Sequence, residues 1–247
     1  MSDSDTLVFI PAWNEEENLP GVLEELQGEL PDVDVLVVDD GSTDRTAEVA
    51  REHGAEVLSL GMNRGLPIGI AAGYAWAREH DYRFCGRVDA DGQHPARELG
   101  RLLALVRQDV CDVAVGSRFV SGEGYEPYRY RPSPARRLGT ALLRRGMRIT
   151  LQRPFADATS GLYAVNAKAL PILAEPFRTE APEVEALIRL NTAGLRVDEV
   201  PVNMEERAGG LSKLRGAKAA KVVLTVVGTL VASRFLWSRA RSGGRPW

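Results

Sequence analysis

Short apolar runs, mostly of β-branched residues, alternate with segments of helical apolar spacing through the first 120 residues. The runs predict strands at Thr6–Pro11, Val33–Asp39, Ala55–Leu60, Phe84–Asp89 and Val113–Gly116. Helical spacing lies between them, over Glu15–Glu29, Asp44–His53, Pro67–Glu79 and Pro95–Gln108. Because strands and helices alternate along the chain, this half predicts a doubly wound, mainly parallel α/β sheet with helices on both faces.

The pattern changes after Gly116. A loop rich in Gly, Tyr, Pro and Arg covers residues 121–134, and a basic helix is predicted at Ala135–Leu151. A strand near Leu162–Val165, a helix near Glu183–Ala193 and a strand near Val197–Val202 follow. These changes divide the chain into a first half at residues 1–120, a second half of the same domain at 121–215, and a C-terminal helix and tail at 216–247.

The C-terminal segment predicts a basic helix that is amphipathic or apolar. Only 12 uncharged, largely apolar residues separate Lys221 from Arg234, whereas a spanning helix needs about 18 or more. The segment either lies on a membrane surface or packs against the core of the protein, and both readings remain open at this stage.

Charge is distributed unevenly along the chain. The last 41 residues carry nine Lys and Arg and no Asp or Glu, so the net charge of -3 leaves -12 for residues 1–206. A second acid-free, arginine-rich stretch covers residues 127–156. Two basic surfaces on an otherwise acidic protein suit phosphate or an anionic membrane surface better than nucleic acid.

The cysteines and the first residues bear on the cellular compartment. Cys85 and Cys111 form no CxxC pair, so neither a disulfide framework nor a zinc site is predicted. The start, MSDSDTLVFIPAWNE, has no basic segment of the kind that begins a signal peptide. We therefore expect a cytoplasmic protein that can attach peripherally to the inner face of the membrane.

Acidic residues follow the predicted strands at the points where the strands end. Asp39 and Asp40 follow the second strand, and Asp89 and Asp91 follow the fourth. An isolated Asp-x-Asp is usually a solvated turn, but the carboxyl ends of parallel strands meet at one edge of a sheet. Converging carboxylates repel one another unless a cation compensates, and oxygen ligands suit Mg²⁺ or Mn²⁺. The pattern therefore favours a metal-bound diphosphate at this edge.

Several other residues near these turns are open to more than one interpretation. One of Asp39 and Asp40 is expected to cap the following helix, while the other accepts hydrogen bonds from a base or ribose. Trp13 is either ordinary core or an aromatic that stacks on the base. His94 is expected to be a turn residue or a helix-start residue rather than a metal ligand. Gly65, Gly69 and Gly73 recur at a spacing of four, which does not match the dinucleotide fingerprint and so disfavours a dehydrogenase.

Seven stretches in order along the chain carry a resemblance to a known family. They are FIPAWNEEENL, VLVVDDGSTDRT, NRGLPIGIAAGYAWA, VDADGQHP, VAVGSRF, DATSGLYAV and VDEVPVNMEERAGGLSK. With them the chain resembles family-two glycosyltransferases of the GT-A fold, and among these the dolichol-phosphate and polyprenol-phosphate mannose synthases. The likeness covers roughly residues 5–236.

The resemblance implies roles for individual residues. Residues 1–120 become the nucleotide-sugar-binding half and residues 121–215 the acceptor-binding half. The donor-binding set is Pro11, Ala12, Trp13, Glu15, Asp39, Asp40, Gly41, Asp89, Ala90, Arg207 and Lys213, the last two contacting the diphosphate. The metal ligands are Asp89, Asp91 and Gln93. The catalytic set is Asp91, Arg118, Arg136 and Glu185, in which the arginines meet an acceptor phosphate and Glu185 lies on a helix near the site.

Three departures from the family pattern stand out. Ala12 and Trp13 occupy places where Thr and Tyr are usual, and Gly92 replaces a bulkier residue. Tyr163 occupies the place of a common arginine. The last departure bears on the acceptor more than on the donor.

Three functions compete at this stage. The leading hypothesis is inverting transfer of a hexose from a GDP- or UDP-linked donor to a polyprenyl phosphate, an acceptor that needs no protein base because its second pKa is about 6. The second is a soluble transferase that acts on a hydroxyl of a small molecule or glycan, with Glu185, Asp157 or Glu183 as base. The third is a phospho-receiver domain, suggested by VLVVDD, which would leave the basic second half without a use.

Overall fold

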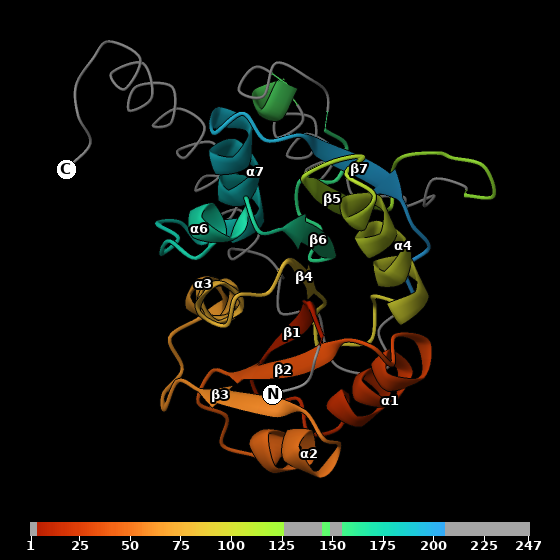
Figure 1. Cartoon of the computed structure of the whole chain (residues 1–247). Helices are drawn as coiled ribbons and strands as arrows, with labels where there is room; N and C mark the ends of the chain where they lie inside the picture. The colour runs from red at the N-terminus through yellow and green to blue at the C-terminus, as the bar shows by residue number, and fades with distance from the viewer. Residues whose placement is uncertain (1–3, 126–144, 149–154, 206–247) are drawn as a thin grey trace, which may run out of the picture.

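The structure is a computed structural model that describes residues 4–125, 145–148 and 155–205. Its strands are β1 (Thr6–Ala12), β2 (Asp34–Asp39), β3 (Glu56–Ser59), β4 (Phe84–Arg87), β5 (Val113–Ser117), β6 (Tyr163–Asn166) and β7 (Val197–Pro201). Its helices are α1 (Leu19–Glu29), α2 (Thr46–Glu52), α3 (Leu66–Glu79), α4 (Ala96–Arg107), α6 (Leu170–Leu173) and α7 (Pro182–Thr192). Figure 1 shows them arranged around one central sheet.

The sheet has the strand order β3-β2-β1-β4-β6-β5-β7. Strands β3, β2, β1 and β4 are parallel neighbours, and β7 is parallel to β5. Strand β6 runs antiparallel to both β4 and β5, with Arg87 opposite Tyr163 in the register. The expected mainly parallel α/β sheet is confirmed; of the strands of the second half, β6 lies between β4 and β5 and β7 lies at the edge of the sheet.

Helices cover both faces of the sheet because the buried strands are apolar on both sides. On β1, Leu7 and Phe9 belong to a core cluster with α3, α6 and α7. Val8 and Ile10 point to the opposite face, into a cluster with α1, α2 and α4. The two sets of helices lie on opposite sides of the sheet in Figure 1.

Helix α3 lies very close to β1 because a glycine faces the strand. A Cβ atom on Gly73 would stand 2.3 Å from the ring of Phe9. One residue later, Tyr74 meets the same ring edge-on, with centroids 4.8 Å apart. Gly69, one turn earlier, faces Pro11 and Val38, so this packing brings the first turn of α3 to the edge where β1 and β2 end.

The predicted elements match the observed ones within a few residues, with one difference at the first helix. Helix α1 begins at Leu19 rather than Glu15 because the preceding residues form a turn bonded to the turn after β2. In that turn the Glu15 N–H donates to Thr46 Oγ1 and the Glu16 N–H to Asp44 Oδ2. Helix α6 has only four residues and was not predicted.

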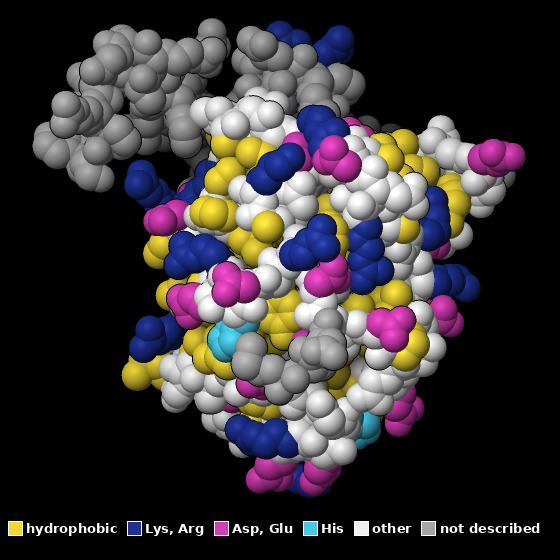
Figure 2. Space-filling view, in the orientation of Figure 1, with side chains coloured by type: hydrophobic (Ala, Val, Ile, Leu, Met, Phe, Trp, Pro, Cys, Tyr) yellow, Lys and Arg dark blue, Asp and Glu magenta, His cyan; other side chains and the backbone are white. Residues whose placement is uncertain are grey.

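Several predicted segments lie outside the described residues. Of the predicted basic helix, residues 145–148 are described and are helical. The C-terminal helix, the rest of the basic helix and most of both basic surfaces are not described. Acidic and basic side chains are intermixed over the described part of the face drawn in Figure 2. Within the described ranges, no helix has the length and apolar character needed to cross a membrane.

Asp112 ties together the ends of three strands away from the carboxyl edge. Its carboxylate accepts from Asn166 Nδ2 at 2.9 Å, from Lys168 Nζ at 3.0 Å and from Arg196 Nε at 3.2 Å. The hydrogen bond from the Arg196 side chain is the largest of the causes that hold the pKa of Asp112 well below its ordinary value. A carboxyl whose pKa is lowered in the folded state stabilises the protein above its unfolded pKa.

We predict that Asp112→Asn lowers the free energy of unfolding by about 2 kcal/mol near neutral pH, because it weakens several charge-assisted hydrogen bonds to a buried carboxylate. The difference from wild type should be complete above about pH 5 and should shrink as the pH falls below about 4, where the unfolded chain takes up protons. Urea unfolding at several pH values measures both effects.

Asp109→Asn is the matched control, since Asp109 also pairs with Arg196 but its side chain is 74% exposed. An exposed pair should contribute less than about 1 kcal/mol. Equal losses in the two variants, or a loss at Asp112 that does not change with pH, would contradict the assignment.

Candidate active site

The turns after β1, β2 and β4 lie along one edge of the sheet, because these strands are parallel neighbours. The backbone of the three turns is held in unusual conformations at defined points. Asn14, Gly41 and Gly92 have φ values of 53°, 67° and 73°, one in each turn. A side chain on Gly41 would collide with the backbone of Met62, at 2.4 Å, so the turn after β2 needs glycine to touch the loop before α3.

Asp39 and Asp40 are both buried and both bind the protein itself. The Ser42 N–H donates to Asp39 Oδ1 at 3.0 Å, and Ser59 Oγ donates to Oδ2 at 3.2 Å. The carboxylate of Asp40 accepts from the backbone N–H groups of Arg64 and Gly65 at 2.7 and 2.8 Å. Asp39 thus forms the expected turn after β2, while Asp40 holds the loop that leads into α3.

The end of β1 and the turn that follows it lie at the same edge of the sheet. Ala12 is buried, and the side chain of Trp13 is exposed at 40%, which excludes an ordinary core position for the indole. The Glu15 carboxylate accepts from Asn18 Nδ2 at 2.8 Å. The next residue, Asn14, joins this turn to the one after β2, because its backbone N–H donates to Ser42 Oγ at 3.0 Å.

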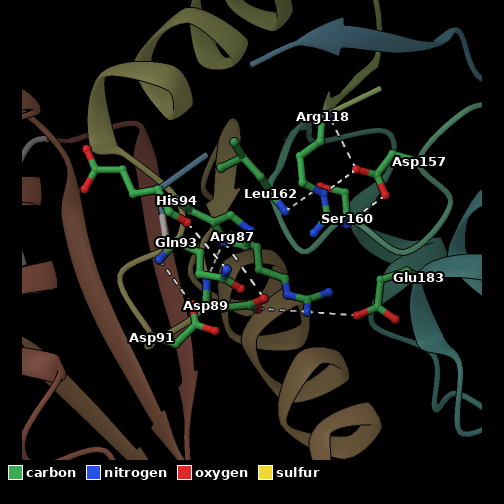
Figure 3. Close-up of polar contacts among 11 residues, drawn as sticks. Arg87, Asp89, Asp91, Gln93, His94, Arg118, Asp157, Ser160, Leu162 and Glu183 are labelled. Carbon is green, nitrogen blue, oxygen red and sulfur yellow. Dashed lines mark hydrogen bonds and ion pairs between the residues drawn. The ribbon is translucent and has the colours of Figure 1, made fainter. Parts of the chain in front are cut away.

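The turn after β4 presents Asp89 and Asp91. The Gln93 N–H donates to Asp91 Oδ1 at 3.1 Å, which closes the turn, while Ala90 is buried beneath it. Gln93 also contacts the chain after β7, since its backbone carbonyl accepts from the Glu205 N–H at 3.1 Å. The three predicted metal ligands therefore lie in one short turn (Figure 3).

A buried arginine lies directly beneath this turn. Arg87 Nη2 contacts Asp89 Oδ1 at 3.1 Å and Glu183 Oε1 at 3.0 Å, and only 3% of the arginine side chain is exposed. Burial by itself lowers the pKa of Arg87, but the carboxylates of Asp89 and Glu183 outweigh it and raise the pKa. The guanidinium is therefore charged and joins the turn after β4 to helix α7 (Figure 3).

A glycine of the loop before β6 packs against the other side of the Asp89 carboxylate. A Cβ atom on Gly161 would stand 2.3 Å from Asp89 Oδ2 and 2.7 Å from Cγ. Only a residue without a side chain leaves room for this carboxylate. Asp89 is thus held between the guanidinium of Arg87 and the backbone of Gly161.

His94 supports the turn from its C-terminal end. Its Nδ1 accepts the backbone N–H of Asp89 at 3.0 Å, which requires an unprotonated nitrogen. Burial is the largest cause that lowers the pKa of His94, and the carboxylates of Asp89 and Asp91 oppose it. The expected role just before a helix is consistent with this contact, because α4 begins two residues later at Ala96.

Arg118 follows β5 and is oriented by a buried carboxylate. Its Nε and Nη2 donate to the two oxygens of Asp157 at 2.8 and 2.9 Å, and the Asp157 side chain is fully buried. The Asp157 N–H donates in turn to Glu199 of β7 at 2.6 Å. Arg118 therefore stands beside the site in a fixed orientation (Figure 3), whereas Arg136, Arg207 and Lys213 lie outside the described residues.

Glu185 lies on α7, the helix that reaches the Asp89 cluster, but its own described contacts are made elsewhere. Its carboxylate accepts from the backbone N–H groups of Arg178 and Thr179 and pairs with Arg189 at 2.5 Å. The acid of α7 that reaches the Asp89 cluster is Glu183. Side chains two positions apart on a helix point about 200° away from each other. Glu183 and Glu185 therefore face opposite sides of α7, and the described contacts of Glu185 are structural.

The donor set at this edge fits a hard divalent cation bound together with a ligand. Within the described ranges, no three His, Cys, Asp or Glu side chains come close enough to hold a metal by themselves. Mg²⁺ and Mn²⁺ are commonly bound by one or two carboxylates while substrate phosphates and water complete the coordination. Asp89 and Asp91 match this chemistry, and the absence of a side chain on Gly161 lets the Asp89 carboxylate lie at this edge.

Arg87 and Gly161 were not among the residues predicted for the site. An arginine in the otherwise apolar stretch FCGRV is a signal that could have been noticed, because a charged residue in a buried strand needs a partner. The close approach of Gly161 to Asp89 had no such signal, since the two residues come from segments far apart in the chain.

Comparisons with known proteins identify the family. The model of glycosyl transferase family 2 matches residues 7–170. The undecaprenyl-phosphate mannosyltransferase of Micrococcus luteus is 34% identical over 96% of this chain and 98% of its own length. The polyprenol monophosphomannose synthase of Mycolicibacterium smegmatis is 31% identical over 90% of this chain and 85% of its own length.

Solved structures agree on the fold. Glucosyl-3-phosphoglycerate synthase from Mycobacterium tuberculosis, crystallised with Mn²⁺, uridine diphosphate and glucosyl-3-phosphoglycerate, superposes with a TM-score of 0.66 at 20% identity. The match covers 93% of this chain and 80% of that one. The expected GT-A fold is thereby confirmed, and the chain belongs to glycosyl transferase family 2.

Proposed function

We propose that the chain is a metal-dependent, inverting hexosyltransferase that uses a GDP- or UDP-linked sugar and a polyprenyl phosphate as acceptor. Two relatives of known name act on undecaprenyl or polyprenol phosphates. A crystallised structural neighbour holds Mn²⁺ with uridine diphosphate. These names support the substrate classes, and the contacts of the site support the chemistry.

One observation favours a phosphate acceptor over a hydroxyl acceptor. Each of the three acids considered as a general base forms an ion pair with an arginine. Asp157 is held by Arg118, Glu183 by Arg87, and Glu185 by Arg189. A hydroxyl acceptor needs a general base to remove its proton, and a carboxylate locked to an arginine serves poorly. A phosphate acceptor is already ionised near neutral pH, because its second pKa is about 6.

The chain's own residues would act mainly by positioning. Asp89 and Asp91, with Gln93 beside them, would hold a divalent cation against the donor diphosphate. A bound Mg²⁺ or Mn²⁺ supplies Lewis-acid neutralisation of the charge that develops on the leaving group. Trp13 would stack on the base, while the backbone of Ala12 and Gly41 would line the nucleoside pocket next to Asp39 and Asp40.

The transfer itself is a single displacement. An oxygen of the acceptor phosphate forms a bond to the anomeric carbon as the bond from that carbon to the diphosphate oxygen breaks. The nucleoside diphosphate leaves with the bonding electron pair, and the anomeric configuration inverts. Arg118, oriented by Asp157, would present positive charge to the acceptor phosphate. Arg136 would assist, and Arg207 and Lys213 would contact the donor diphosphate.

The proposed localisation follows from the acceptor. A polyprenyl phosphate resides in a membrane, so the protein would work in the cytoplasm at the inner face of the membrane, attached peripherally. The basic, partly apolar segment at residues 216–247 would supply this attachment through anionic lipids.

We predict that Asp89→Asn and Asp91→Asn each abolish most of the stabilisation that Mn²⁺ and a nucleoside diphosphate confer together, because each removes a charged ligand. Wild type should gain about 2.7 kcal/mol with ligand at about 100 times its Kd. Thermal unfolding with GDP and with UDP, each with and without Mn²⁺, measures the gain. Asp32→Asn, an exposed acid far along the chain from the turn, is the control, and full gain in either site variant would refute the metal assignment.

We predict that Gly161→Ala folds, at a cost of about 1–3 kcal/mol from overpacking, and loses metal-dependent nucleotide binding. The added methyl group would displace the Asp89 carboxylate, which lies within 2.7 Å of its position. Gly21→Ala in α1 is the control, because a Cβ atom there meets nothing within 4 Å. Calorimetric titration with Mn²⁺ and nucleotide distinguishes them, and unchanged affinity in Gly161→Ala would contradict the geometry of the site.

We also predict that transfer to a polyprenyl phosphate exceeds transfer to the matching polyprenol by about 100-fold or more, the usual contribution of a general base that the alcohol would lack. Initial rates with one labelled nucleotide sugar and the two acceptors, in the same detergent, provide the measurement. Comparable rates with the alcohol would favour the hydroxyl-directed alternative.

A further inference from the structure

Arg87 is a charged residue in a position where the fold calls for an apolar one. Its neighbour on the same face of β4 is Cys85, which belongs to the core cluster beneath α3 and α7. Arg87 itself is 2% exposed, and its Nε is buried without a hydrogen-bond partner among the described residues. Burying a guanidinium with an unsatisfied N–H is unfavourable. An apolar side chain would therefore stabilise this strand at least as well, so stability alone does not account for Arg87.

The contacts of Arg87 explain its presence through Asp89 instead. A single nitrogen, Nη2, contacts both Asp89 Oδ1 and Glu183 Oε1, at 3.1 and 3.0 Å. Asp89 lies in a turn and its side chain is 35% exposed, so the contact with Arg87 and the packing of Gly161 restrict the orientation of its carboxylate. Glu183 lies on α7, 96 residues away in the chain, and anchors the arginine from the opposite side.

We propose that Arg87 is a positioning residue, anchored by Glu183, that holds the Asp89 carboxylate in the orientation needed for the metal-bound diphosphate. The inference rests on the proposed function, since it assumes that Asp89 binds the metal. Hydrogen bonds to ligand carboxylates fix their orientation, and loss of such partners commonly weakens metal binding by about 10- to 100-fold.

The register of the sheet places Arg87 beside the buried Tyr163. Arg87 on β4 stands directly opposite Tyr163 on β6, and Tyr163 is the position where the family resemblance leads us to expect an arginine. Side chains of directly opposed residues point to the same face of a sheet. Both side chains approach the start of α7, since Tyr163 is buried and its hydroxyl lies 3.5 Å from the Glu183 carbonyl oxygen.

A role in positioning and a role in charge screening predict opposite effects for Arg87→Met. If Arg87 only screened charge, its removal would leave the site more negative and would tighten Mn²⁺ binding. If Arg87 positions Asp89, removal of the guanidinium lets the Glu183 carboxylate repel the Asp89 carboxylate from its orientation, and Mn²⁺ binding weakens. The double variant Arg87→Met/Glu183→Met keeps the net charge unchanged and so isolates the effect on orientation.

The experiment measures Mn²⁺ affinity by calorimetric titration at saturating nucleoside diphosphate, with thermal unfolding of each ligand-free variant in parallel. We expect the double variant to unfold close to the wild-type temperature, since replacing a buried ion pair by apolar side chains is often neutral. Its Kd for Mn²⁺ should rise about 10-fold or more. We expect Arg87→Met to weaken Mn²⁺ binding as well, and Arg87→Lys to bind between wild type and the double variant because it keeps the charge but not the planar fork.

Arg189→Met is the matched control. It breaks another largely buried Arg–Glu pair on the same helix, with side chains 12% and 9% exposed, whose described contacts do not include Asp89. It should lower the unfolding temperature and leave the Kd for Mn²⁺ within about twofold of wild type. A Kd that rises equally in this variant would show that α7 packing, and not Arg87, sets the metal affinity, and would overturn the proposal.

The outcomes separate this inference from the proposed function. Tighter Mn²⁺ binding in Arg87→Met, or wild-type affinity in a folded double variant, overturns the positioning role while leaving the metal site intact. If the double variant does not fold, Arg87→Lys decides the same question. If wild-type protein shows no Mn²⁺-dependent nucleotide binding, or if Asp89→Asn binds Mn²⁺ as wild type does, the proposed function fails instead.

Discussion

Mutual repulsion of carboxylates at the carboxyl edge of the sheet is the constraint on which the rest of the site depends. The parallel strands β1, β2 and β4 deliver their acidic turns to one edge, and like charges held close together destabilise a fold unless each is compensated. Here each carboxylate has a distinct partner. Asp39 and Asp40 accept backbone N–H groups, and Asp89 meets the guanidinium of Arg87.

The partners differ in what they allow the carboxylate to do. Backbone N–H groups hold Asp40 against the loop before α3, so this acid fixes the position of that loop. Asp89 is only partly buried, and its contacts orient it without enclosing it. This difference in partners explains how one edge of the sheet carries several acids, of which Asp89 and Asp91 are the pair suited to a cation.

Carboxylates of the second half link it to the first half and to its own loops. Glu183 of α7 pairs with Arg87 of β4. Glu199 of β7 accepts the N–H of Asp157, and the Asp157 carboxylate orients Arg118. The two arginines that flank the site are thus fixed by acids on α7 and in the loop before β6. A consequence for chemistry is that these acids are committed to arginines, which favours an acceptor that arrives already ionised.

The sequence by itself determined the order and type of most elements, because strand and helix periodicities are local properties of the chain. It also predicted the edge at which Asp89 and Asp91 meet, since the direction of parallel strands follows from their alternation with helices. The family itself was predicted from seven short motifs and is confirmed by the comparisons.

Only the tertiary structure decided which partners the acids have. The role of Asp40 depends on a loop 24 residues away in the chain. Glu183 rather than Glu185 faces the site because of how α7 is rotated against the sheet. The antiparallel insertion of β6 between β4 and β5 places Tyr163 opposite Arg87 and brings Gly161 against Asp89. These are contacts between residues distant in the chain, and no periodicity or spacing encodes them, because they arise from packing that the whole fold settles at once.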